Sequence, residues 1–196
     1  MDIKKLFVKK RVSDYVLFSV IIVVGIILDQ LTKWLAVTYL KPIWSDSVPI
    51  IEGVLQLTYA ENTGAAFSML SDAPWVFKSI STVAIIAMAI YLYGCKGGRR
   101  LQDVALAMIV SGGIGNMIDR LSFYGLLPMN EGVTVVRDFI DFCLIDFAIF
   151  NGADSFVCVG AGLLILSLIL DMKDEYKKEQ EAKAKRENPP SEGDAE

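Results

Sequence analysis

The chain has 196 residues, 54% of them hydrophobic, with a formal net charge of −4 and a mean hydropathy of +0.47. A soluble domain is less apolar than this, and no basic stripe of the kind that binds nucleic acid is present. His is absent, which excludes Ser-His and Cys-His catalytic pairs and His-based zinc motifs and leaves acid–base chemistry to Asp, Glu, Lys, Tyr or Cys.

Four apolar segments have about the length that a helix needs to cross a bilayer, roughly 20 residues. They cover about residues 15–34, 75–93, 101–121 and 151–170. The first follows a basic arm, as the core of a signal peptide does, but it continues into Asp29-Gln30-Leu31-Thr32-Lys33 where a cleavage site of small residues would stand. We therefore expect it to be retained, and residues 1–170 to form one membrane domain with four spans.

The segments outside the spans differ in pattern. Residues 50–59 are β-branched and aromatic with partial alternation, which predicts a short hairpin or cradle on the surface. Residues 122–150 are mixed, carry further Asp residues and show little regular period. Residues 171–196 alternate in charge and are expected to begin as a helix and end disordered. The predicted fold class is a mainly α membrane protein with four transmembrane helices and a small extracytoplasmic β-rich cradle.

Basic residues predict the orientation of the spans. Of 19 Lys and Arg residues, five lie in the N-terminal arm, three between the second and third spans, and six in the C-terminal tail. The positive-inside rule then places both termini in the cytoplasm. Asp29, Asp119 and Asp154 each lie roughly 25–28 Å along a helix from the cytoplasmic end of their span. Three carboxylates are therefore expected at one level, near the outer face of the membrane.

An ionisable side chain at membrane depth is costly, so these carboxylates predict a functional site. Asp29 and Lys33 are four residues apart and share a helical face, which indicates either an intrahelical ion pair at an interface or a pair that anchors the site. Asn116, Asp119 and Arg120 share another face, after small residues that let helices approach closely. They either hold the helix bundle together through hydrogen bonds or take part directly in a reaction at this site.

Asp154 stands at the start of the fourth span, where an Asp often serves only as a helix cap. A second carboxylate close by would make the two share a proton, with one protonated and one ionised near neutral pH. Such a pair can activate water and protonate a leaving group without His or a metal. Asp138 lies in a nearby loop of the predicted fold, and Arg137 beside it is expected to lower its pKa.

Five motifs occur in the order typical of one family. They are Asp29-Gln-x-Thr-Lys33, Asn62-Thr-Gly-Ala-Ala-Phe-Ser68, Gly112-Gly-x-Gly-Asn116-x-x-Asp119-Arg120, Val136-x-Asp138-Phe139 and Asn151-x-Ala-Asp154-Ser155. Over about residues 15–170 the chain therefore resembles lipoprotein signal peptidase, also called signal peptidase II.

The resemblance implies an aspartic endopeptidase of the bacterial inner membrane. Such an enzyme cuts signal peptides from prolipoproteins just before a Cys that bears a diacylglyceryl group. Asp138 and Asp154 would be the catalytic pair, although Asp141 stands only three residues further on. The substrate-binding or supporting residues would be Asp29, Lys33, Asn62, Gly64, Asn116, Asp119, Arg120 and Asn151. The resemblance also implies contact with membrane lipids and inhibition by globomycin, and we expect neither a metal nor a cofactor.

Three rival interpretations remain. A Ser–Lys peptidase would use Ser68 or Ser155 with Lys33. A small proton-coupled carrier would use intramembrane Asp residues as a relay, but it predicts acids spread through the depth of the membrane rather than gathered at one face. A non-catalytic assembly factor is disfavoured only by the motifs.

Overall fold

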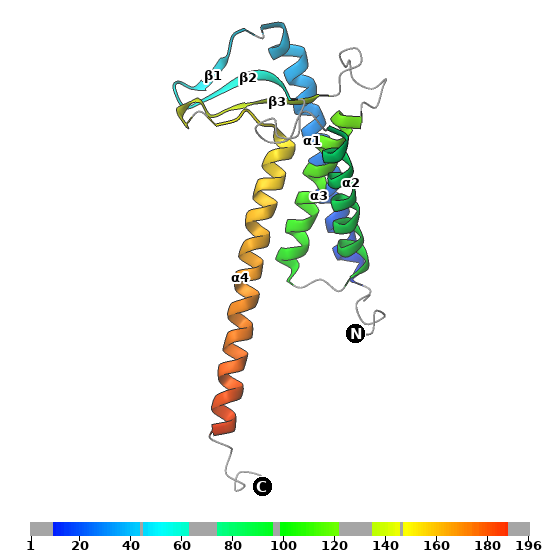
Figure 1. The fold of residues 1–196 in the computed structure, drawn as a ribbon, viewed down its shortest axis with the longest axis vertical. Coiled ribbons are helices and arrows are strands. Elements are labelled where there is room, and N and C mark those ends of the chain that lie inside the picture. The colour runs from blue at the N-terminus through cyan, green and yellow to red at the C-terminus, as the bar shows by residue number, and fades with distance from the viewer. Residues whose placement is uncertain are drawn as a thin grey trace.

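The computed structural model describes residues 10–43, 45–62, 74–95, 99–121, 135–145 and 147–187. Within these ranges the chain forms four α-helices and one three-stranded sheet. The helices are α1 (Val12–Leu35), α2 (Pro74–Gly94), α3 (Arg100–Leu121) and α4 (Gly152–Glu187). The sheet covers one end of the helices, whereas the start of α1 and the end of α4 lie on the side away from it (Figure 1).

The helices present large apolar side chains on their outer faces. Val20 and Ile27 on α1, Ile86 on α2 and Ile165 on α4 are each more than half exposed. Three helical segments are long and apolar enough to cross a membrane, and α2 adds a shorter apolar stretch; in chain order they are Val12–Ile43, Ser79–Gly94, Arg100–Leu121 and Gly152–Ala184. A backbone in lipid must form all its hydrogen bonds internally, so helices with apolar outer faces are suited to cross a bilayer. The predicted mainly α membrane fold is confirmed.

The central helix is α3, which packs against the other three. Glycines allow the close approach: a Cβ on Gly112 would lie 2.2 Å from the carbonyl oxygen of Ala153, and one on Gly115 would lie 2.6 Å from Oδ2 of Asp29. These contacts bring the backbone of α3 against α4 and against the polar end of α1. Small residues serve the same purpose wherever membrane helices pack tightly.

The sheet has the antiparallel order β1-β2-β3, with β1 (Val48–Ile51), β2 (Leu55–Asn62) and β3 (Val136–Asp141). The predicted hairpin is confirmed as β1 and β2. The expectation that Asp138 lies in a loop is wrong, because β3 is a strand. Four of its six residues are buried, so no alternation of apolar and polar residues reveals it. The pairing sets Asp138 opposite Ala60.

The fourth helix continues from the membrane span into the charged tail, whose first part was expected to be helical. It continues to Glu187, and Figure 1 shows it extending well past the ends of the other helices. Arg99 holds this extension to the bundle: its Nε lies 2.6 Å from Oδ1 of Asp171, and its Nη2 also pairs with Asp174. Residues 188–196, where disorder is expected, lie outside the described ranges.

Replacing Gly112 by Ala is predicted to weaken the α3–α4 contact, because the new methyl group meets backbone rather than a flexible side chain. Overpacking of this kind costs about 1–3 kcal/mol. The matched control is Gly162→Ala on α4, where a Cβ meets nothing within 4 Å. Thermal unfolding in detergent should show a lower midpoint for Gly112→Ala and an unchanged or higher one for the control. Equal midpoints for the two variants would contradict the close α3–α4 approach.

Candidate active site

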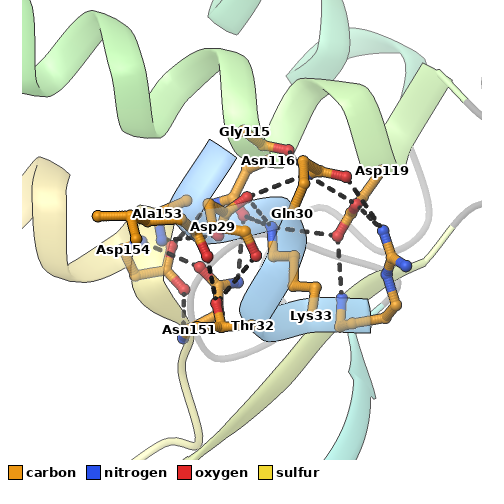
Figure 2. A network of polar contacts seen from close by, with 12 residues as sticks. Asp29, Gln30, Thr32, Lys33, Gly115, Asn116, Asp119, Asn151, Ala153 and Asp154 are labelled. Carbon is orange, nitrogen blue, oxygen red and sulfur yellow. Dashed lines mark hydrogen bonds and ion pairs between the residues drawn. The ribbon is translucent and has the colours of Figure 1, made fainter. Parts of the chain in front are cut away.

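A buried lysine joins the helices beneath the sheet. Lys33 Nζ lies 2.9 Å from Oδ2 of Asp29 and 3.1 Å from Oδ2 of Asp119, and all three side chains are at most 1% exposed. The same ammonium donates a hydrogen bond of 2.9 Å to Oδ1 of Asn116. Figure 2 shows the resulting network, with side chains from α1 and α3 directed toward one another. The predicted intrahelical pair therefore exists, and it also reaches a second helix.

Arg137 completes the charge balance of this network. Its guanidinium pairs with Oδ1 of Asp119, and its backbone N–H donates to Oδ2 of the same carboxylate at 3.3 Å. Two cations thus face two anions, which is what burial of charge requires. The expected lowering of the Asp138 pKa by Arg137 is wrong. Successive residues of a strand point to opposite faces, and Arg137 is directed away from Asp138 to Asp119.

Asp29 connects the network to the start of α4. Its Oδ1 accepts a hydrogen bond of 2.9 Å from the backbone N–H of Ala153, in the first turn of that helix. An anion at this position satisfies one of the unpaired N–H groups and interacts favourably with the helix dipole. Gln30 Nε2 adds hydrogen bonds to Oδ2 of Asp29 at 3.0 Å and to the carbonyl of Gly115 at 3.1 Å. The positions of α1, α3 and α4 are therefore fixed at one point.

Two amide side chains lead from this network to a pair of carboxylates. Asn116 Nδ2 donates to Oδ1 of Asp154 at 2.7 Å. Asn151 Nδ2 donates to Oδ1 of Asp138 at 2.6 Å and to Oδ1 of Asn116 at 3.1 Å. Asn62 Nδ2 reaches the other oxygen of Asp138 at 3.2 Å. Asp138 from β3 and Asp154 from α4 are thus held by one connected set of hydrogen bonds.

Both carboxylates line a single cleft of about 550 Å³. Its polar side also includes Asn62, Asn116 and Arg120. The rest of the lining is mainly apolar and includes Phe142, Ile145, Phe147, Ile149, Phe150, Val157 and Cys158. A few convergent polar groups in a largely apolar cleft are typical of a ligand-binding or active site. Across the described ranges, no group of three or more Asp, Glu or Cys side chains is arranged to hold a metal ion.

The two carboxylates have different surroundings. Burial and the nearby Asp154 carboxylate raise the pKa of Asp138 to about 7, against the partial opposition of the hydrogen bonds from Asn151 and Asn62. Asp154 accepts hydrogen bonds from Asn116 and, at 3.1 Å, from the backbone N–H of Asn151. The site therefore favours the protonated form of Asp138 up to about neutral pH.

The structure brings most of the residues from the sequence motifs to this one site. Asp29, Lys33 and Asp119 form its charged base, and the remaining described members, which are Asn62, Asn116, Arg120, Asp138, Asn151 and Asp154, line or adjoin the cleft. Gly64 lies outside the described residues. Asp141, the alternative to Asp138, is directed elsewhere: its Oδ2 accepts hydrogen bonds from Gln56 at 2.6 Å and Thr58 at 2.8 Å.

The geometry disfavours a Ser–Lys pair. Lys33 is engaged by two carboxylates and an amide, whereas the Ser155 hydroxyl donates to the carbonyl of Asn151 at 3.1 Å. Ser68 lies outside the described residues. The sequence interpretation missed two members of the network, Gln30 and Arg137. Gln30 stands next to Asp29, and a strand assignment at 136–141 would have placed Arg137 and Asp138 on opposite faces.

Comparison with known proteins places this site in a family. A family model described as signal peptidase (SPase) II matches residues 21–170. The chain belongs to the signal peptidase II family. The lipoprotein signal peptidases of Halalkalibacterium halodurans and Bacillus subtilis are each 39% identical to it over 166 residues, which cover 99% of either relative and 85% and 84% of this chain respectively.

Solved structures agree with this membership. A bacterial membrane enzyme solved by the in meso method at 2.3 Å superposes with a TM-score of 0.70 at 30% identity, covering 86% of this chain and 95% of that one. A second, at 1.9 Å, gives a TM-score of 0.63 at 32% identity. Membership in the signal peptidase II family makes the chain a peptidase with a multi-pass membrane fold, and it gives no support to the proton-coupled carrier.

Removing the charge of Lys33 is predicted to destabilise the fold strongly. Lys33→Met leaves Asp29 and Asp119 with Arg137 as the remaining cation of the buried network, and breaking a buried pair costs about 3–5 kcal/mol. Thermal unfolding in detergent measures the loss. The control is Lys177→Met, whose side chain is 78% exposed and 3.9 Å from Glu181, and which should change little. Similar small effects for both variants would contradict a structural role for the buried charges.

The raised pKa of Asp138 predicts a pH dependence of stability. The folded chain binds this proton more tightly than the unfolded chain, where the pKa is near 3.8. The resulting stabilisation is complete below about pH 4 and is lost as pH rises to about 7. Wild type should therefore lose stability relative to Asp138→Asn across this window, as measured by unfolding at several pH values. A difference that stays constant, or moves in favour of wild type, would contradict the assignment.

Proposed function

We propose that the chain is a membrane aspartic endopeptidase that removes signal peptides from diacylglyceryl-modified bacterial prolipoproteins, cutting just before the lipidated Cys. Membership in the signal peptidase II family supports the substrate class. The observation that carries the catalytic type is the pair Asp138 and Asp154, which line one cleft and are joined through Asn116 and Asn151. Two carboxylates that share a proton are the characteristic arrangement of aspartic peptidases.

The difference between the two carboxylates suggests their roles. Asp154, which accepts hydrogen bonds from Asn116 and from the backbone N–H of Asn151, takes a proton from a water molecule whose oxygen attacks the scissile carbonyl carbon. Asp138, with its pKa raised to about 7, gives its proton to the carbonyl oxygen. The tetrahedral species then collapses: the C–N bond breaks as the leaving nitrogen takes the proton from Asp154, and Asp138 takes back a proton from a hydroxyl on the same carbon, which becomes the carbonyl of the new carboxylic acid. Both carboxylates thus return to their starting states.

The remaining motif residues divide into two groups in this proposal. Asn62, Arg120 and Asn151 adjoin the reacting carboxylates and bind or orient the substrate around the cut. Asp29, Lys33, Asn116 and Asp119 hold together the helices that support β3 and α4, which carry the carboxylates, as their mutual contacts within 3.1 Å indicate. Gly64 is proposed to support the substrate from the segment after β2.

The apolar wall of the cleft fits a substrate that stays partly in lipid. Phe142, Phe147 and Phe150 line the cleft, and the exposed apolar side chains of α4 extend this apolar surface. The signal helix of the substrate would enter sideways from the bilayer while its acyl chains remain among the lipids. Globomycin is proposed to inhibit by occupying the two carboxylates.

The proposed location is the bacterial inner membrane. The positive-inside pattern predicts that both termini lie in the cytoplasm. The sheet lies at the other end of the helices (Figure 1), and its strand β3 contributes Asp138 to the cleft. The cleft would then open at the outer face, where a translocated prolipoprotein presents its lipidated Cys. Residues 171–187 would extend α4 into the cytoplasm.

The test is cleavage of a diacylated prolipoprotein by purified protein in detergent, followed by the size shift of the product. Asp138→Asn and Asp154→Asn should each reduce cleavage by at least about 10⁴-fold while the protein still inserts and folds, because each removes a proton-transfer group. Asp141→Asn, on the same strand but outside the cleft, is the matched control and should cleave at near the wild-type rate. Near-normal cleavage by either of the first two variants would refute the catalytic pair.

A further inference from the structure

Arg137 is held to the helix bundle by one carboxylate at two points. Asp119 accepts its backbone N–H at 3.3 Å through Oδ2 and pairs with its guanidinium through Oδ1. Nη2 also lies 3.5 Å from Oε1 of Gln30 on α1. The residue is only 2% exposed, so these contacts lie beneath the sheet and away from solvent. The main chain of β3 at this position is therefore fixed against α3 and α1.

The next residue along β3 is Asp138. Its Cα lies about 3.8 Å from that of Arg137, and its side chain points to the other face of the strand, into the cleft. The opposite carboxylate, Asp154, is carried by α4 and is held from α3 by Asn116. The separation of the two carboxylates thus depends on how firmly β3 is fixed to α3. The contact between Arg137 and Asp119 fixes β3 to α3 on the face of the strand that points away from the cleft.

The charge of Arg137 also bears on the Asp154 side. Asp119 is shared between Arg137 and Lys33, and Lys33 in turn donates to Oδ1 of Asn116. Without Arg137, the Lys33 ammonium would be the remaining cation facing both Asp29 and Asp119. Asp119 would then attract this ammonium more strongly, at the expense of its hydrogen bond to Asn116. The amide that holds Asp154 would lose part of its own support.

We propose that Arg137 is a positioning residue for the peptidase reaction: through Asp119 it sets the β3 carboxylate against the α4 carboxylate. This inference rests on the proposed function. Among the described residues, Nε and Nη1 of Arg137 have no hydrogen-bond partner, so the guanidinium acts through Nη2. A Lys can reproduce a contact made at one point, whereas it cannot reproduce a two-pronged one. Arg137→Lys is therefore expected to preserve the function of the residue.

The experiment measures kcat and KM for a diacylated prolipoprotein with full-length Arg137→Met, Arg137→Lys and the exposed control Arg100→Met. A small displacement of a reacting group lowers the chemical step rather than substrate binding. Arg137→Met should lower kcat roughly 10- to 100-fold with KM within about threefold of wild type. Arg137→Lys should recover at least about a third of the wild-type kcat, and Arg100→Met should match wild type.

A double variant tests the route through Asp119. If Arg137 acts through that carboxylate, Arg137→Met combined with Asp119→Asn should be no slower than the slower single variant, because both remove the same contact. Independent, multiplying losses would overturn the proposal.

Other outcomes also decide the question. A wild-type kcat in Arg137→Met, or a raised KM with unchanged kcat, would show that Arg137 does not position the reacting groups. If Arg137→Met fails to fold, Arg137→Lys decides alone: a folded but inactive Lys variant overturns the inference. Failure of wild type to cleave the lipidated substrate would instead refute the proposed function.

Discussion

The burial of the Lys33 ammonium between Asp29 and Asp119 is the interaction on which the rest of the site depends. Moving an ion out of water costs several kcal/mol, and only close counter-charges with further hydrogen bonds offset that cost. Asp29 and Asp119 lie 2.9 and 3.1 Å from the ammonium, and Arg137 balances the second anion. Asp29 lies on α1 and bonds to the start of α4, Asp119 lies on α3, and Arg137 lies on β3. Pairing the charges therefore fixes α1, α3, α4 and β3 relative to one another.

The need to pair these buried charges also explains how a chain without His could arrange the acid–base groups of the proposed mechanism. The side-chain oxygen of Asn116 accepts a hydrogen bond from Lys33, and its nitrogen donates one to Asp154. The charged network therefore orients the amide, and the amide orients the carboxylate. Asp138 stands at the same cleft in a more buried position on a strand. In the proposed mechanism, these different surroundings let one of two identical side chains act as the acid and the other as the base.

Helix-based features were predictable from the sequence because they are local. The spacing of Asp29 and Lys33 predicted their ion pair, and the rise per residue placed Asp29, Asp119 and Asp154 at one level, where the structure brings their helices together. The hairpin was predictable from the alternation in residues 50–59. Local pattern carries this information whatever the tertiary contacts are.

Features that depend on distant contacts were not predictable. β3 pairs with a strand far earlier in the chain and is buried along most of its length, so its residues show no alternation. Without that strand, Asp138 was assigned to a loop and Arg137 was given the wrong partner. The different positions of Asp138 and Asp141 likewise depend on the sheet. Asp138 lines the cleft, whereas Asp141 accepts hydrogen bonds from Gln56 and Thr58.

The central claim is that Asp138, in the cleft that it shares with Asp154, keeps its proton up to about neutral pH. Infrared spectroscopy of the folded protein, titrated from about pH 5 to about pH 9, observes the protonated carboxyl directly. The account predicts a carboxylic acid band that disappears with a midpoint near pH 7, is absent in Asp138→Asn, and shifts to a lower midpoint in Asp154→Asn because the neighbouring charge is gone. A band near neutral pH that survives in Asp138→Asn, or no titration in this range, would contradict it.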